Sequence, residues 1–224
     1  MKRILMIAAV VLAAFFIFSC TEEKPGESVP SPAPESTEES STEEESTEKL
    51  QGDKTLVVYF SRTGEQRIVG VIEKGNTEIL AEYIAEKTGA DLFEIKPMID
   101  YPYTQSDLEL RARQEQTERA RPVIMGTVPD LSEYSTIYVG APVWYNDWPM
   151  IMYTFFERFD LSGKTLIPFN TNEGGGPASF EFNLKYTCPD SDVKKCFAAA
   201  GQDCQNNFDR VKQQFDEYYS TLEL

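Results

Sequence analysis

The sequence predicts an α/β domain in which a parallel sheet is covered by helices on both faces. From Thr55 onward, short apolar runs rich in β-branched and aromatic residues alternate with segments whose apolar residues recur at helical spacing. Small polar, glycine or aromatic residues follow several of the apolar runs, at the points where such sheets bind ligands. The roughly 170 residues of this region are enough for one domain with a sizeable core.

The first residues have the pattern of a secretory signal peptide, predicted over residues 1–19. Lys2 and Arg3 precede an apolar run, Ile4–Phe18, that is shorter than the roughly 20 residues of a membrane-spanning helix. The run ends in Ile17-Phe18-Ser19-Cys20, which resembles the lipobox of bacterial lipoproteins. The resemblance implies a lipidated Cys20 and an exported protein anchored to a bacterial membrane, at the cell surface or in the periplasm. An ordinary secretory signal with an unrelated cysteine is the alternative.

Residues 20–54 are predicted to form a disordered, acidic linker. Positions 21–54 contain eleven acidic and three basic residues among Ser, Thr and Pro, with few large apolar side chains. Such a segment buries too little surface to fold, so it is expected to be an extended spacer in front of a domain over residues 55–224. That domain carries −10 of the chain's net charge of −16, which argues against nucleic acid and favours a protein partner with a basic surface.

Five strands and four helices are expected within the domain. The first helix shows the pattern clearly, because Leu80, Tyr83 and Ile84 share one stripe and Gly89 is a stop signal. The predicted strands are Leu56–Phe60, Asp91–Ile95, Thr136–Gly140, Lys164–Phe169 and Val193–Ala199, and the predicted helices are Thr77–Thr88, Ser106–Arg119, Trp148–Phe159 and Gln205–Leu222.

Histidine is absent, and this excludes several kinds of chemistry. Without it there is no Ser-His or Cys-His nucleophile and little basis for a zinc site, so neither a catalytic residue nor a metal is predicted. Besides Cys20, the chain has Cys188, Cys196 and Cys204. One disulfide among these three and three small buried side chains are both compatible with the sequence.

Three loops at the ends of predicted strands can face one crevice, because parallel strands end at a common edge of the sheet. The first loop has hydroxyl groups and glycine at a strand end and again at a helix start, a pattern that binds phosphate. The second is rich in aromatic residues and the third in glycine. The candidate residues are Ser61, Arg62, Thr63, Gly64, Asn76 and Thr77 in the first loop, Pro142, Val143, Trp144, Tyr145 and Asn146 in the second, and Asn172, Glu173, Gly174, Gly175 and Gly176 in the third.

A ligand that fits all three loops has an anionic end, a flat aromatic ring and a polar ring edge, as FMN does. Trp144 or Tyr145 can stack on the ring, and Asn172 can hydrogen-bond its edge. Asp147 and Glu173 are either solvated carboxylates or negative charges that disfavour an anionic reduced flavin. Trp148, just before Pro149, is expected to start the following helix.

The chain resembles flavodoxins over about residues 55–222. The resemblance rests on Tyr59–Gly64, Gly75-Asn76-Thr77, Thr88–Ile95, Pro142-Val143-Trp144 and Gly163-Lys164-Thr165. It implies a three-layer, doubly wound, five-stranded parallel sheet with strand order 2-1-3-4-5, and FMN bound non-covalently by the candidate residues. The sequence departs from the family at Glu65–Lys74, which interrupt the phosphate loop, and at Asn172, where many relatives have histidine.

The leading functional interpretation is an FMN-binding electron carrier, tethered by lipid to the outer face of a bacterial membrane and serving protein redox partners. One alternative is an FMN-dependent oxidoreductase that uses NAD(P)H or quinones. Another is a binding module with this fold and no cofactor.

Overall fold

The computed structural model describes residues 52–223. The predicted signal peptide, Cys20 and the predicted linker as far as residue 51 lie outside the described residues. The first strand, β1, spans Lys54–Tyr59 and so begins two residues before the strand expected from the sequence. In this part of the chain, no helix has the length and apolar character needed to cross a membrane.

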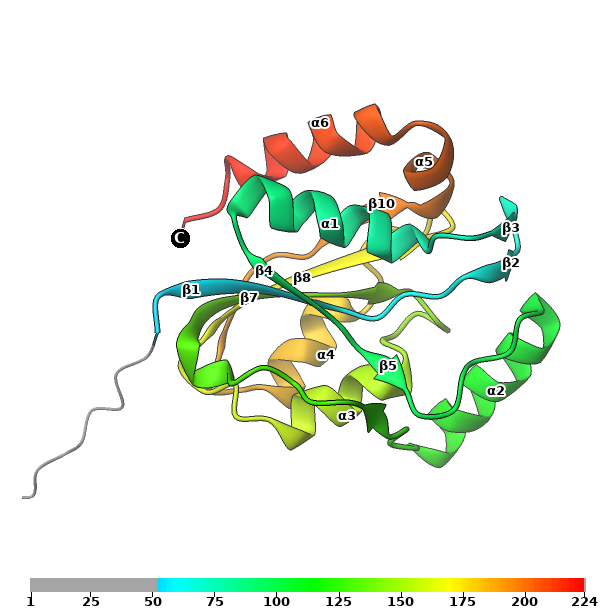
Figure 1. Ribbon diagram of the computed structural model, residues 1–224, viewed down its shortest axis with the longest axis horizontal. Helices are drawn as coiled ribbons and strands as arrows, with labels where there is room; N and C mark the ends of the chain where they lie inside the picture. Colours follow the sequence, from blue (N-terminus) through cyan, green and yellow to red (C-terminus); the bar gives the residue numbers. More distant parts are fainter. Residues whose placement is uncertain (1–51, 224) are drawn as a thin grey trace, which may run out of the picture. The chain divides into compact units, whose positions relative to one another are not determined.

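The central sheet is parallel and has the predicted order 2-1-3-4-5 (Figure 1). β1 pairs with β4 (Asp91–Glu94) on one side and with β7 (Tyr134–Pro142) on the other. β7 pairs with β8 (Thr165–Asn172), and β8 pairs with the fifth strand, which lies at the edge of the sheet. This strand is split into β9 (Asp192–Val193) and β10 (Phe197–Ala200), and at the split the Cys196 N–H donates to the Glu181 carboxylate, 3.3 Å away.

Helices cover both faces of the sheet (Figure 1). Alternate residues of β1 build the two cores, since successive side chains of a strand point to opposite faces: Val57 and Tyr59 face one layer, and Leu56 and Val58 the other. The first layer contains α1 (Asn76–Thr88), α5 (Gly201–Asn206) and α6 (Phe208–Tyr219), and the second contains α3 (Met150–Arg158) and α4 (Phe180–Thr187), with α2 (Gln105–Glu118) beside α3.

The first three predicted helices are confirmed, with ends that differ by at most two residues. The fourth was wrongly predicted as one continuous helix. The expected helix over Gln205–Leu222 is two helices, which meet at Asn207 with φ −150°. The helix α4 was not expected at all.

The residues that interrupt the phosphate loop form an ordered β-hairpin. β2 (Gly64–Gln66) pairs antiparallel with β3 (Gly70–Ile72). Gly64 and Gly70 have φ of 88° and 73°, a left-handed conformation that favours glycine. Two short strands, β5 (Lys96–Pro97) and β6 (Ile124–Met125), pair beyond β4, and a 3-10 turn, Leu131–Glu133, precedes β7.

The three cysteines of the described domain are free and buried. The structure thus matches the second of the two alternatives left open by the sequence. Burial raises the pKa of the Cys188 thiol to about 11 and that of Cys204 to about 12, so both are protonated and unreactive near neutral pH.

Candidate functional site

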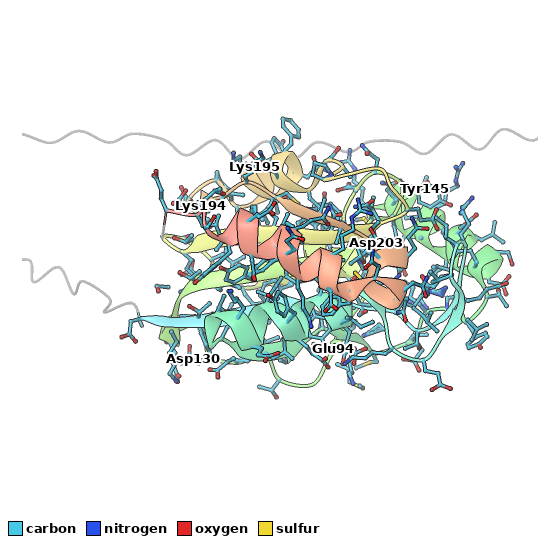
Figure 2. The ribbon with its side chains drawn as sticks, turned by 90° about the horizontal axis from the view of Figure 1, so that it is seen from above. Glu94, Asp130, Tyr145, Lys194, Lys195 and Asp203 are labelled. Atoms are coloured by element: carbon cyan, nitrogen blue, oxygen red, sulfur yellow. The ribbon has the colours of Figure 1, made fainter. Side chains whose placement is uncertain are left out.

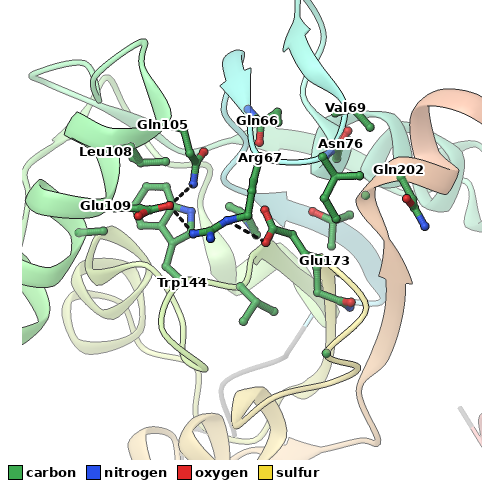
Figure 3. A pocket seen from close by; sticks show the side chains of 18 of the residues that line it. Gln66, Arg67, Val69, Asn76, Gln105, Leu108, Glu109, Trp144, Glu173 and Gln202 are labelled. Carbon is green, nitrogen blue, oxygen red and sulfur yellow. Dashed lines mark hydrogen bonds and ion pairs between the residues drawn. The ribbon is translucent and has the colours of Figure 1, made fainter.

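A cavity of about 440 Å³ lies at the carboxyl edge of the parallel sheet, within the size range of small-molecule sites. Tyr145 and Asp203 mark this end of the domain in Figure 2, and Asp130 and Lys194 mark the opposite end. Six segments line the cavity: Gln66–Val69 of the hairpin, Asn76 of α1, one face of α2 (Gln105, Leu108, Glu109 and Ala112), Pro142–Tyr145, Thr171–Glu173 with Gly175, and Gly201–Gln202. Figure 3 shows the cavity from close by, with Arg67, Trp144 and Glu173 among the labelled side chains.

Half of the sixteen predicted residues line this cavity. They are Asn76, Pro142, Val143, Trp144, Tyr145, Asn172, Glu173 and Gly175. A second cavity of about 350 Å³ is lined by Ser61, Arg62 and Thr63. Gly64, Thr77, Asn146, Gly174 and Gly176 line neither of the two. The candidate residues therefore gather at one edge of the sheet without surrounding a single cavity.

The interrupted phosphate loop is closed in space. A Cβ atom on Gly75 would lie 2.0 Å from the Ser61 Oγ and 2.9 Å from the Arg62 carbonyl oxygen, so only glycine fits here. The Ser61 Oγ accepts from the Glu78 N–H at 3.1 Å, and the Glu78 carboxylate accepts from the Gly75 N–H at 3.2 Å. Ser61 thus caps α1 from another segment, because Gly75 at the N-cap has no side chain to do so.

The other two residues of this motif are also held in place. The Thr77 hydroxyl, which is buried, hydrogen-bonds the Thr171 hydroxyl of β8 at 2.7 Å. The Asn76 Oδ1 accepts from Gln205 at 2.8 Å. A Cβ on Gly201 would lie 2.5 Å from the Asn76 Nδ2, so α5 approaches the start of α1 through a glycine. We call Ser61 with Gly75-Asn76-Thr77 the cradle.

Arg62 points away from the cradle. Its guanidinium donates to the carbonyl groups of Thr63 (3.3 Å), Glu65 and Tyr103 (3.5 Å), and burial lowers its pKa. The side chain therefore fastens the base of the hairpin, and only the backbone of Arg62 adjoins the cradle.

The aromatic loop contains a tight turn with left-handed backbone. Trp144 and Asp147 exchange two backbone hydrogen bonds of 3.0 Å, and Tyr145 and Asn146 between them have φ of 50° and 64°. These are the features of a type I′ turn, whose first central position rarely holds an aromatic residue. The Tyr145 hydroxyl donates to the Glu109 carbonyl oxygen at 2.8 Å, which ties the turn to α2.

The two tryptophans have different roles. Trp144 lines the cavity and packs edge-on against Phe60 and Tyr101, with ring centroids 5.4 and 4.8 Å apart. Trp148 is buried in the core, stacked on Phe180 at 3.6 Å, and precedes α3, which starts at Met150. Trp144 is thus the tryptophan available to a ligand.

Two polar residues of the aromatic loop support the loop itself. The Asn146 side chain donates to the Ser179 Oγ at 3.0 Å. The Asp147 carboxylate accepts from the Tyr153 hydroxyl at 2.9 Å and from Asn183 at 2.6 Å, and it does not line the cavity. Asp147 therefore ties the loop to α3 and α4 and places no charge on the cavity wall.

The glycine-rich loop is shaped by a pair of asparagines. Asn172 donates to the Asn170 Oδ1 at 2.9 Å and accepts from the Gly174 N–H at 2.8 Å. Gly174 and Gly176 have φ of 100° and 71°, which side chains disfavour. The Asn172 amide is thus largely engaged within its own loop, while the loop borders the cavity.

A family model of flavodoxin matches residues 54–214. The chain belongs to the flavodoxin family. Two solved structures, from Bacteroides uniformis and Bacteroides eggerthii, are provisionally named flavoproteins. The first is 32% identical, covers 74% of this chain and 99% of its own, and has a TM-score of 0.60. The second is 30% identical and covers 71% of this chain and 98% of its own, with a TM-score of 0.56.

A flavoprotein from Lactobacillus acidophilus, solved in complex with FMN, is 19% identical, with a TM-score of 0.52 over 69% of this chain and 97% of its own. At this identity the likeness shows the fold alone. No curated protein sequence matched the chain.

This flavodoxin has a cavity wall that sequence reasoning missed. The hairpin contributes Gln66 and Arg67, and α2 contributes Gln105, Leu108 and Glu109. Arg67 lies between Glu109 and Glu173 and forms an ion pair with each (Figure 3). Gly64 and Gly70 in the insertion could have indicated a hairpin, but no sequence signal shows that it leans toward α2.

Proposed function

We propose that this flavodoxin binds FMN non-covalently and works as an electron carrier. The observation that carries the proposal is the closed cradle. Gly75 touches Ser61 although the insertion separates them in the sequence, and the resulting site lies at the start of α1. Backbone N–H groups and hydroxyls at a helix N-terminus are suited to a phosphate. The FMN complex of the Lactobacillus acidophilus protein supports the choice of ligand.

The chemistry of the cradle fits a phosphate group. The Gly75 N–H already donates to a carboxylate, that of Glu78, so an oxygen anion is accommodated at this point. The missing Cβ of Gly75 leaves the loop and the helix start in contact. The Ser61 Oγ accepts the Glu78 N–H and so keeps its own proton for a phosphate oxygen, and the Thr77 hydroxyl is a second donor when the Thr171 hydroxyl donates to it.

When bound, the isoalloxazine ring of FMN supplies the redox chemistry. The residues of the chain bind and orient it. The cradle holds the phosphate, Trp144 and Tyr145 provide aromatic surface for the ring, and the loop shaped by Asn172 offers backbone groups to the ring edge. Electron transfer needs no acid or base from the protein, in agreement with the absence of histidine.

An FMN-dependent oxidoreductase acting on NAD(P)H or quinones is the second candidate. The observation in its favour is the additional wall, because Gln66 and Gln105 bring amide groups to the cavity beyond those of the three expected loops. Such groups can hydrogen-bond a small substrate.

The test is an absorbance titration of the domain from residue 50 onward with FMN, followed by anaerobic reduction. On binding, the flavin absorbance bands are expected to shift to longer wavelength or to lose intensity, and this change is expected to saturate. The bound flavin is expected to be reducible. Absence of binding at high FMN contradicts both redox functions and leaves a cofactor-free module. Turnover of NADH or a quinone by the loaded protein, above the rate of free FMN, favours the enzyme over the carrier.

The proposal includes a lipid tether at Cys20 and redox partners with basic surfaces. The support is the signal-like N-terminus and the acidity of the domain. In cells, a Cys20→Ser variant is expected to leave the membrane fraction and to lose incorporation of labelled fatty acid. Retention of both properties contradicts the tether.

A further inference from the structure

The hairpin borders the cavity, and one side chain, Arg67, joins its tip to the facing walls. The Arg67 Nε lies 3.3 Å from a carboxylate oxygen of Glu173 in the glycine-rich loop. Its Nη2 pairs with Glu109 of α2, which also accepts from Gln105 at 2.9 Å. Arg67 therefore joins three walls of the cavity, as the dashed lines in Figure 3 show.

These ion pairs add little to the stability of the fold. The side chains of Arg67, Glu109 and Glu173 are 59%, 38% and 51% exposed, and pairs so exposed contribute little to folding. The base of the hairpin has its own attachments, since the Glu65 carboxylate accepts from the Gln105 N–H at 2.9 Å and the Glu65 N–H donates to the Tyr103 carbonyl oxygen at 3.0 Å. What the pairs of Arg67 add is a link from the hairpin tip to two other walls of the cavity.

Arg67 also sets the charge of the cavity wall. Among the described residues that line the cavity it is the one cation, and Glu109 and Glu173 are the two anions. A flavin ring gains negative charge when it is reduced to the anionic form. A nearby cation favours that form, and nearby carboxylates disfavour it.

We propose that Arg67 is a positioning residue for the cofactor: it holds the inserted hairpin across the cavity and offsets the two carboxylates of its wall. This inference rests on the proposed binding of FMN. It assigns a role in cofactor retention and redox tuning to the insertion that separates this chain's phosphate loop into two parts.

The experiment compares Arg67→Gln, Arg67→Lys and Glu173→Gln in the domain from residue 50 onward. Lys87→Gln is the control, because it removes one positive charge at the far end of α1, where Lys87 pairs with Asp216. Three quantities are measured: the FMN dissociation constant, the midpoint potential of bound FMN, and hydrogen exchange of amides 65–72 in the FMN-free protein.

Arg67→Gln is expected to weaken FMN binding by roughly three- to tenfold and to move the potential to a more negative value. Glu173→Gln is expected to move it the opposite way, and Arg67→Lys to restore most of the wild-type potential. Exchange of the hairpin amides in Arg67→Gln is expected to speed up by about threefold or more. A purely structural role would shift the potential in the same direction in both neutralising variants.

The outcomes separate this inference from the proposed function. If the wild type binds FMN and Arg67→Gln matches it in affinity and potential, the role of Arg67 is overturned while the FMN site stands. If the wild type binds no FMN, the proposed function fails and the cofactor role fails with it. Unchanged exchange in the FMN-free variant overturns the claim that Arg67 holds the hairpin.

Discussion

The cradle and the hairpin wall border the same edge of the sheet but are built in opposite ways. In the cradle, Thr77 and Thr171 are buried and share a 2.7 Å hydrogen bond, and Gly75 touches Ser61. In the wall, the side chains of Arg67 and its two carboxylate partners are between 38% and 59% exposed. The cradle is fixed mainly by close packing and by hydrogen bonds between uncharged groups, apart from the one from the Gly75 N–H to the Glu78 carboxylate. The wall is fixed by charges in contact with solvent.

The difference shows how one site can set the affinity for FMN and the redox potential of the bound FMN with different residues. Buried hydrogen bonds have strict geometry and are shielded from salt, so they can hold a phosphate in one place. Exposed ion pairs are weak and screened, so changing them alters local charge and hairpin position with little effect on the fold. We therefore expect changes in the cradle to act mainly on FMN affinity, and changes in the wall to act mainly on potential and dynamics, with a smaller effect on affinity.

The strongest way to break this division is Gly75→Ala. The added Cβ would overlap the Ser61 Oγ and crowd the Arg62 carbonyl oxygen, so Ser61 must turn away and release the Glu78 N–H. We expect FMN binding to weaken by about 3 kcal/mol, at the upper end of overpacking costs. Fluorescence titration with FMN measures the effect.

Gly89→Ala is the matched control at the other end of α1. Gly89 has φ 68°, and a Cβ added there would meet no atom within 4 Å, so alanine at this position is strained without touching the cradle. We expect a loss of about 1 kcal/mol in folding stability and unchanged FMN affinity. Equal losses of affinity in both variants would mean that α1 as a whole, and not the cradle contact, determines binding.

Removing the two cradle hydroxyls tests the same region with less disturbance. The double variant Ser61→Ala, Thr77→Ala is expected to weaken FMN binding by about 1–3 kcal/mol, the loss typical of hydrogen bonds to a charged group. Thr77→Ala also leaves the buried Thr171 hydroxyl without its partner. Thr171→Val is therefore measured alongside, by the same titration. If it weakens binding as much as the double variant does, the Thr77 hydroxyl is structural and the phosphate assignment fails.

Glu78→Gln tests how one negative charge beside the cradle affects FMN affinity. The Glu78 carboxylate accepts the Gly75 N–H, so it places a negative charge next to the proposed phosphate position. Glutamine can accept the same hydrogen bond without the charge. We expect FMN to bind roughly threefold more tightly, because one like charge is removed from a partly solvated site. Glu86→Gln, two turns along α1, is the control, and tightening in both variants would point to net charge alone.

The same division separates what the sequence could predict from what it could not. The sheet order was implied by the resemblance to flavodoxins, and both this resemblance and the prediction of the cradle rest on short patterns such as Gly75-Asn76-Thr77. These features depend on local backbone preferences and on neighbours fixed by the sheet. The hairpin strands are three residues each, too short to show a period, and their packing on α2 depends on contacts between distant segments.

The two errors in the predicted helices, one helix missed and one not broken, have local causes. α4 buries only Phe180 and Leu184 and exposes Phe182 and Tyr186, so its apolar residues alternate as in a strand. The last helix breaks at Asn207, where the apolar stripe of α6 begins anew with Phe208. Asn172 lines the cavity, as predicted for a ligand-facing residue. The sequence did not show that its amide also shapes its own loop, because this role depends on the buried Asn170 two residues away.

A change in salt concentration is the mildest test of the difference between the cradle and the wall, and it leaves every residue in place. Raising NaCl from about 0.05 to about 1 M shortens the Debye length to roughly 3 Å, which screens the exposed pairs of Arg67. We expect hydrogen exchange of hairpin amides 65–72 to accelerate by about twofold in the FMN-free protein, and amides 76–80 of α1 to stay unchanged, because the Thr77–Thr171 hydrogen bond is buried and neutral. In Arg67→Gln the hairpin should lose its salt response, since the screened pairs are already gone. A uniform response of both regions, or one that persists in the variant, would show that the two are not held in different ways.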